Sequence, residues 1–220
     1  MKKNQKVFRM VLLSALTVFF FNCKKSDTPV ILPTLDYSTF MDARDGKTYK
    51  TVKIGNLEWM SENLSFKTAS GSWYYDDADI NGAKFGRLYT LEAAELAVPE
   101  GWHLPTDLEW KQLEISLGMS STEADGVDFR GTNEGTKLKT TSGWPENGNG
   151  TDEVHLTVLP GGFRSNAGGY LVLNWYAYFW TSTEVDTNTA WVRTISYNNT
   201  KIGRIKSFKG DGYSVRCIKN

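Results

Sequence analysis

Apolar and polar residues alternate in several short stretches of this 220-residue chain, a pattern typical of β-strands. Residues 49–54 and 57–60 flank Gly55 and Asn56, a pair that suits a two-residue turn, so they predict a β-hairpin. Further strands are expected at residues 154–159, 179–182, 190–197, 202–208 and 213–218. Residues 126–152 are dense in Gly, Asn, Thr and Asp, and they predict a loop.

Two helices are predicted in the middle of the chain. Residues 88–97 are rich in Ala, Leu and Glu, and Pro99 stops the helix that they predict. Thr106 and Glu109 have the spacing of a capping box, so a second helix is expected to begin after Thr106. It carries Trp110 and two leucines on one face and ends at Gly118. Helices followed by a run of antiparallel hairpins indicate an α+β fold.

The N-terminal segment is interpreted as an export signal. Its basic start is followed by an apolar run of 12 residues, 10–21, which is too short to span a bilayer. The run ends beside Cys23, and this arrangement resembles a bacterial lipoprotein signal, in which that cysteine is lipidated. We expect a signal peptide at 1–22, a flexible tether at 23–41 and one domain at 42–220. The alternative is an ordinary signal in which Cys23 is incidental.

The charge of the chain is unevenly distributed. Lys and Arg number 25, as do Asp and Glu, so the formal net charge is zero. The first 22 residues hold four basic residues and no acidic ones, so the remainder has 25 − 4 = 21 basic and 25 acidic residues, a net of −4. A mildly acidic body argues against nucleic acid as a partner. The predicted location is a membrane-anchored lipoprotein of the cell envelope, with the outer membrane or cell surface left open.

Cys23 and Cys217 are the two cysteines of the sequence. In an exported protein they could form a disulfide bond. If Cys23 carries lipid instead, Cys217 is a lone thiol. Its alternating neighbours predict that it is buried on a strand, where a thiol is inert.

Eight strings spread over the body of the chain resemble the Fibrobacter succinogenes major paralogous domain family. They are residues 45–55 (DGKTYKTVKIG), 59–64 (WMSENL), 86–89 (GRLY), 99–106 (PEGWHLPT), 135–139 (GTKLK), 159–164 (LPGGFR), 179–184 (FWTSTE) and 213–217 (YSVRC). The resemblance implies a C-type-lectin-like architecture, with two helices beside two small antiparallel sheets and long loops on one side. It implies no established activity.

The resemblance also has consequences for crosslinks and catalysis. Members often carry cysteines where this chain has Val98, Tyr74 and Gly82, so the family disulfides are absent here. Residues 103–110 look like the second helix of formylglycine-generating enzymes, which share the architecture. Those enzymes use cysteine chemistry that Cys217, on a terminal strand, does not reproduce.

One acidic segment is a candidate metal site. Asp77, Asp79 and Asn81, followed by Gly82, match the front half of a calcium loop. The EF-hand pattern requires Glu at its twelfth position, where this chain has Leu88. A polar surface loop is the preferred interpretation, and no metal or other cofactor is expected.

Aromatic residues in the Gly- and Asn-rich segments are the candidate binding residues. Trp144, Trp175 and Tyr176 lie in or beside such segments, and Asn147 offers an amide among them. Exposed aromatic rings near amides suit stacking on sugars or anchoring of a protein. The alternative is that these rings cap the loops against the core.

We therefore expect a lipid-anchored envelope module that binds an extracellular glycan or protein through its loop face and is not an enzyme. No G-x-S-x-G or H-E-x-x-H motif is present. Two alternatives remain open: an active or degenerate enzyme of the formylglycine-generating type, and a purely structural envelope protein.

Overall fold

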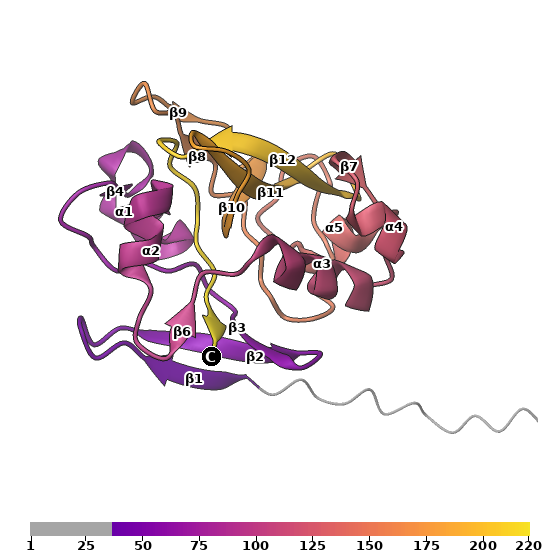
Figure 1. Cartoon of the computed structure of the whole chain (residues 1–220), viewed down its shortest axis with the longest axis horizontal. Coiled ribbons are helices and arrows are strands. Elements are labelled where there is room, and N and C mark those ends of the chain that lie inside the picture. The colour runs from indigo at the N-terminus through magenta and orange to yellow at the C-terminus, as the bar shows by residue number, and fades with distance from the viewer. Residues whose placement is uncertain (1–36) are drawn as a thin grey trace, which may run out of the picture. The chain divides into compact units, whose positions relative to one another are not determined.

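The computed structural model describes residues 37–220, and Figure 1 shows their arrangement. The expected signal peptide, Cys23 and most of the expected tether lie outside the described residues. Within residues 37–220, no helix has both the length and the apolar character needed to cross a membrane.

Two larger antiparallel sheets organise this part of the chain. The five-stranded sheet has the order β1 (Ser38–Met41), β2 (Thr48–Ile54), β3 (Leu57–Met60), β13 (Ile218–Lys219) and β6 (Trp102–His103). The four-stranded sheet has the order β10 (Tyr176–Glu184), β11 (Thr189–Ser196), β12 (Ile202–Phe208) and β7 (Asp128–Arg130). Two short pairs complete the strands: β4 (Ser72–Trp73) with β5 (Leu88–Tyr89), and β8 (Phe163–Arg164) with β9 (Tyr170–Leu171).

Short helices fill the connections between the strands. They are the 3₁₀ turn η1 (Tyr75–Asp77), α1 (Asp79–Phe85), α2 (Leu91–Ala97), α3 (Asp107–Ser116), α4 (Ser121–Ala124) and α5 (Glu134–Leu138). Figure 1 shows α3 between the two larger sheets. The predicted capping box is confirmed, because Thr106 Oγ1 accepts from Glu109 N at 3.2 Å and Glu109 Oε2 accepts from Thr106 N at 2.8 Å. Helices with small antiparallel sheets form the predicted α+β fold.

The clearest strand predictions are confirmed. Ile54 pairs with Leu57, and Gly55 in the turn has a φ of 61°, which glycine adopts without steric cost. β10, β11 and β12 cover the strands expected at 179–182, 190–197 and 202–208.

Two predicted strands are wrong. Residues 154–159 do not form one, because His155 and Thr157 have φ values of 54° and 49° and break the extended conformation. Of residues 213–218, only Ile218 is in a strand of a sheet. The rest of this segment bonds to a different partner at each step, so it forms no continuous ladder.

Two further predictions differ from the structure. The helix predicted at 88–97 begins only at Leu91, because Leu88 and Tyr89 pair with β4 and Thr90 caps α2. The expected loop at 126–152 contains β7 and α5, which β12 and the backbone of Thr200 hold in place.

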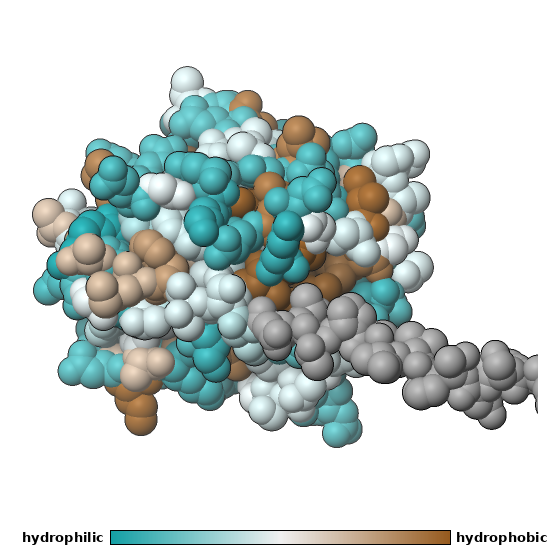
Figure 2. Space-filling view, turned by 90° about the horizontal axis from the view of Figure 1, so that it is seen from below, coloured by the Kyte–Doolittle hydropathy of each residue, from teal (hydrophilic) through white to brown (hydrophobic). Residues whose placement is uncertain are grey.

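The ordered domain begins earlier than residue 42. β1 lies inside the segment expected to be tether, and its four residues pair with β2 from Ser38 to Met41. Figure 2 views this side of the molecule from below and shows hydrophilic and neutral residues over most of it, with hydrophobic residues in separate groups.

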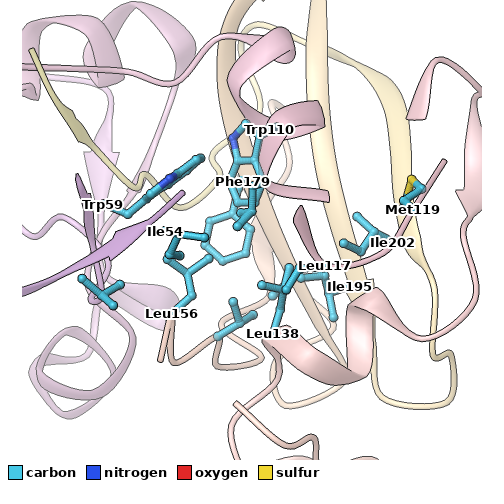
Figure 3. Packing of buried hydrophobic residues seen from close by; sticks show 14 of the residues in the cluster. Ile54, Trp59, Trp110, Leu117, Met119, Leu138, Leu156, Phe179, Ile195 and Ile202 are labelled. Atoms are coloured by element: carbon cyan, nitrogen blue, oxygen red, sulfur yellow. The ribbon is translucent and has the colours of Figure 1, made fainter. Parts of the chain in front are cut away.

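The main core lies between the two larger sheets. The Trp110 ring of α3 is 5.1 Å from that of Trp59 in β3 and 5.5 Å from that of Phe179 in β10, measured between centroids. Figure 3 shows these three rings meeting beside Ile54 and Leu156. A second cluster of buried residues includes Tyr49, Trp180 and Cys217 and packs against α2.

A buried network of charges fastens α3 to the four-stranded sheet. Asp107 accepts from Arg204 of β12 at 2.8 and 2.9 Å and from Arg193 of β11 at 2.8 Å. Glu114 accepts from Arg193 at 2.6 Å and also from Arg130 of β7. Burial opposes ionisation of Asp107, but hydrogen bonds from Arg204 and the charge of Arg193 hold its pKa well below the usual range. Each of the strands β7, β11 and β12 thus contributes one arginine that bonds to a carboxylate of α3.

We predict that Glu114→Gln destabilises the protein by about 3–5 kcal/mol, since the side chain is fully buried and its charge balances two buried arginines. Urea unfolding followed by tryptophan fluorescence measures this loss. Glu95→Gln, on the exposed side of α2, serves as the control and should change stability by less than about 0.5 kcal/mol. Equal effects of the two substitutions would contradict the role of the network.

Candidate functional site

Trp144, predicted to be an exposed binding residue, is instead part of the core. Its side chain is 5% exposed, and its indole N–H donates to the carbonyl of Val158 at 3.1 Å. The ammonium of Lys139 lies 5.4 Å from the ring centroid. The expectation of exposure is wrong because the tight turns around Trp144 fold its ring inward against Leu138 and Leu156. A buried ring in this position cannot stack on a ligand.

Trp175 is the predicted aromatic residue that reaches the surface. Its side chain is 39% exposed, and its ring lies edge-on to Tyr197 with centroids 4.6 Å apart. Tyr197 N donates to Trp175 O at 2.9 Å, so the backbone also joins the two residues. The carbonyl oxygen of Tyr197 lies close to Gly148, since a Cβ added to Gly148 would be 2.5 Å from it. Asn147 is exposed and precedes Gly148, so its backbone lies near that of Tyr197.

We call Asn147, Trp175 and Tyr197 the Trp175 face. Lys139 holds it from beneath, since its ammonium donates to the carbonyls of Ser196, Tyr197 and Asn199 at 3.2–3.3 Å. Burial lowers the pKa of Lys139. The face is thus a rigidly supported aromatic surface.

Tyr176 does not join this face. It begins β10, where successive side chains point to opposite sides of the sheet. Its ring stacks on that of Tyr178 at 5.8 Å, and Tyr178 stacks on Tyr213 at 5.2 Å. Tyr176 is therefore the half-buried end of a tyrosine row.

The three candidate metal ligands are engaged elsewhere. Asp77 accepts from the Tyr170 hydroxyl at 2.8 Å, and Asn81 donates to the carbonyl of Tyr75 at 2.9 Å. Asp79 begins α1, so the segment is a helix rather than a calcium loop around Gly82. Among residues 37–220, no three His, Cys, Asp or Glu side chains are grouped to hold a metal ion.

Cys217 is buried, as expected, and has no cysteine partner among residues 37–220, although it lies just before a strand rather than in one. Burial raises the pKa of the Cys217 thiol, so the protonated, unreactive form is favoured. His103 is held between Glu109 at 2.8 Å and Asn220 at 2.7 Å, so both of its ring nitrogens have protein partners.

A cleft that sequence patterns did not reveal lies at the meeting of several distant segments. It has a volume of about 310 Å³ and is lined by Tyr37, Lys47, Lys50, Glu62, Asn63, Ala83, Lys84, Phe85, Gly86, Thr140, Thr157, Leu159 and Arg216. We call it the Arg216 cleft. Arg216 is 1% exposed, and burial lowers its pKa to about 9, so the guanidinium stays charged at neutral pH.

Neutral acceptors surround the Arg216 guanidinium. It donates to Asn63 Oδ1 at 2.7 Å and to the carbonyls of Leu156, Met60 and Thr157 at 2.7, 3.2 and 3.2 Å. Among the described residues it forms no ion pair with a carboxylate. Glu62 and Asp152 offset its charge only through longer-range attraction, so the burial of this cation is costly.

Thr157, which lines the Arg216 cleft, and two residues close to it in sequence have strained backbone. Asp152, His155 and Thr157 have φ values of 46°, 54° and 49°, in the left-handed region that side chains disfavour, most of all a β-branched one. Asp152 Oδ1 accepts from Thr157 N at 2.8 Å, and Ser61 Oγ donates to His155 O at 2.5 Å. Strain of this kind is frequent at functional sites.

Comparison with known proteins identifies the family. The sequence profile described as the Fibrobacter succinogenes major domain matches residues 52–219, most of the chain. The chain belongs to this family. No curated protein and no solved structure matches it.

Five of the eight strings that resemble the family contribute residues to the lining of the Arg216 cleft, although Lys47 and Lys50 lie before the matched residues 52–219. Lys47 and Lys50 come from residues 45–55, Asn63 from 59–64, Gly86 from 86–89, Leu159 from 159–164 and Arg216 from 213–217. No local pattern could have indicated this convergence, since these strings lie far apart in the sequence.

We predict that Trp144→Ala lowers stability by about 3–5 kcal/mol because it empties a core position. Trp175→Ala should cost only about 1 kcal/mol, since it removes one edge-on contact from an exposed ring. Urea unfolding of the two variants checks the order, and a larger loss for Trp175→Ala would contradict the assignment of core and surface.

Proposed function

We propose that this protein is an exported, lipid-anchored module of the bacterial cell envelope that binds an extracellular glycan or protein without catalysis. The basic start, the apolar run of residues 10–21 and Cys23 beside its end support export and lipidation. One lipidated cysteine attaches a protein to a membrane without a membrane-spanning helix.

We further propose that the architecture is C-type-lectin-like. Two observations support this assignment. The first and last strands of the described chain, β1 and β13, belong to the same sheet. The chain between α5 and β10 is long and contains only the short pair of β8 and β9.

The observation that carries the binding proposal is the exposure of Trp175 on a supported surface. Its ring cannot turn freely because Tyr197 lies against it, and Lys139 fixes the backbone of Tyr197. A ring held in this way binds a sugar face or an apolar side chain at little cost in conformational entropy. Asn147 supplies an amide for hydrogen bonds at the edge of the same surface.

We predict that Trp175→Ala abolishes or strongly weakens the binding of glycans or envelope proteins found by glycan array and pull-down. A loss of about 2 kcal/mol, or roughly thirtyfold in Kd, is expected for a central aromatic anchor. Tyr170→Ala, which removes an aromatic ring from β9, is the control. Unchanged binding by Trp175→Ala would show that the ligand uses another surface.

We predict that full-length protein incorporates radiolabelled palmitate in a bacterial host and fractionates with membranes. Cys23→Ala should abolish both, because the thiol of Cys23 is the attachment point of the lipid in this proposal. Cys217→Ala is the matched control, since that thiol is buried. Label that persists in Cys23→Ala would refute the anchor.

A further inference from the structure

The Arg216 cleft carries an excess of positive charge. Its lining contains four basic residues, Lys47, Lys50, Lys84 and Arg216, and one acidic residue, Glu62, so the formal charge is +4 − 1 = +3. Residues 23–220 as a whole have a net charge of −4. A small positive cleft on an acidic body concentrates anions at that place.

Two carboxylates, Glu62 and Asp152, partly offset the charge of Arg216, and counting Asp152 with the lining still leaves a formal charge of +4 − 2 = +2. Glu62 Oε2 accepts from the backbone N–H of Lys50 at 2.8 Å. Asp152 accepts from Thr157 N, and burial raises its pKa. Among the described residues, Lys47, Lys50 and Lys84 form no ion pair.

All three ammonium groups lie over aromatic rings, Lys47 Nζ being 5.4 Å from the centroid of Tyr49. Lys50 Nζ is 5.2 Å from the centroid of Tyr37, and Lys84 Nζ is 4.7 Å from that of Phe85. Tyr37 is 38% exposed. An exposed ring beside a cation suits a ligand that combines an apolar ring face with an anionic group.

We propose that the Arg216 cleft binds the acidic group of a glycan, a carboxylate or sulfate on a single sugar residue. Its volume of about 310 Å³ is at the small end for ligand pockets, which fits one sugar residue. The acidic group contacts the lysines, and the sugar ring lies against Tyr37. Arg216 strengthens binding from the floor of the cleft through its fixed charge.

The chemistry of the cleft leaves its lysines, rather than Arg216, to contact the anionic group. Arg216 has five N–H groups, and four of them already donate to protein acceptors. It therefore cannot offer the two parallel donors with which arginine holds phosphate. The exposed lysines act as point charges, which suit a carboxylate or sulfate equally well.

The inference rests on the proposed function, glycan binding outside the cell, but it concerns a separate surface. The test uses full-length protein in detergent and isothermal titration with oligogalacturonate for carboxylates and a sulfated chondroitin oligosaccharide for sulfates. A neutral cello-oligosaccharide, polyglutamate and inorganic phosphate are titrated in parallel.

The double variant Lys50→Gln/Lys84→Gln should weaken acidic-glycan binding roughly tenfold, because two ion contacts with the acidic group are lost. Lys53→Gln/Lys206→Gln removes the same charge from exposed positions outside the cleft and should leave binding within about threefold. Added salt should weaken acidic-glycan binding by the wild type and reduce the difference in Kd between the two double variants.

Several outcomes would overturn the inference. These are failure of both acidic glycans to bind the wild type, equal weakening by the two double variants, and tighter binding of polyglutamate or phosphate than of either glycan. If acidic binding is lost in Trp175→Ala and kept in Lys50→Gln/Lys84→Gln, the proposed function stands and the Arg216 cleft does not. The reverse result places glycan binding in the cleft instead of the Trp175 face.

Discussion

The fold depends on the last nine residues of the chain, which pass through its centre and bond to a new element at almost every step. Their backbone bonds join Gly212 to Arg164, Tyr213 to Tyr89, Ser214 to Trp180, Val215 to Leu64, Cys217 to Met60 and Asn220 to Gly101. The segment therefore links the four-stranded sheet, the β4–β5 pair and the five-stranded sheet. Since buried backbone groups must be paired, the partners of this segment cannot separate without exposing unpaired groups from both sides. All of these partners are far from the segment in sequence as well as spread over the fold. Figure 1 shows the segment ending at β13 beside β3 and β6.

The same segment explains why a charge is buried at the floor of the cleft. Arg216 is the side chain that supplies donors to Met60, Leu156 and Thr157, whose carbonyls would otherwise be buried without partners. An apolar residue there would leave those acceptors unsatisfied, at about 1–3 kcal/mol each. The guanidinium thus has a structural task, pinning the strained segment around Thr157, and it brings a fixed positive charge with it. Because Arg216 is held by these hydrogen bonds to the protein, its positive charge stays in the cleft whether or not a ligand is bound.

Local sequence signals predicted the elements that local interactions form. The turn at Gly55, the capping box of Thr106 and the alternating strands β11 and β12 each rest on neighbours in the chain, and each is present. The failures share the opposite property. Residues 154–159 have an apolar pattern, but Ser61 and Arg216 bond to their backbone from far away and hold it in left-handed conformations. Trp144 and Trp175 lie in similar Gly- and Asn-rich surroundings, and only tertiary packing separates the buried ring from the exposed one. The Arg216 cleft was beyond prediction for the same reason, because distant segments assemble it.

The positions of the missing family cysteines show how packing replaces a crosslink. Tyr74 and Gly82 stand where the resemblance implies a cysteine pair, and in this chain they touch: a Cβ on Gly82 would lie 2.4 Å from the Tyr74 ring. Only glycine leaves room for that ring, so the two residues are complementary. Arg87 also packs on the Tyr74 ring, with its guanidinium carbon 3.8 Å from the ring centroid. Val98, at the third such position, packs in the same apolar cluster as Cys217. A disulfide fixes two points by restricting the unfolded chain, whereas these contacts act only in the folded state. At these positions the described domain therefore relies on packing, together with the segment that ends at β13.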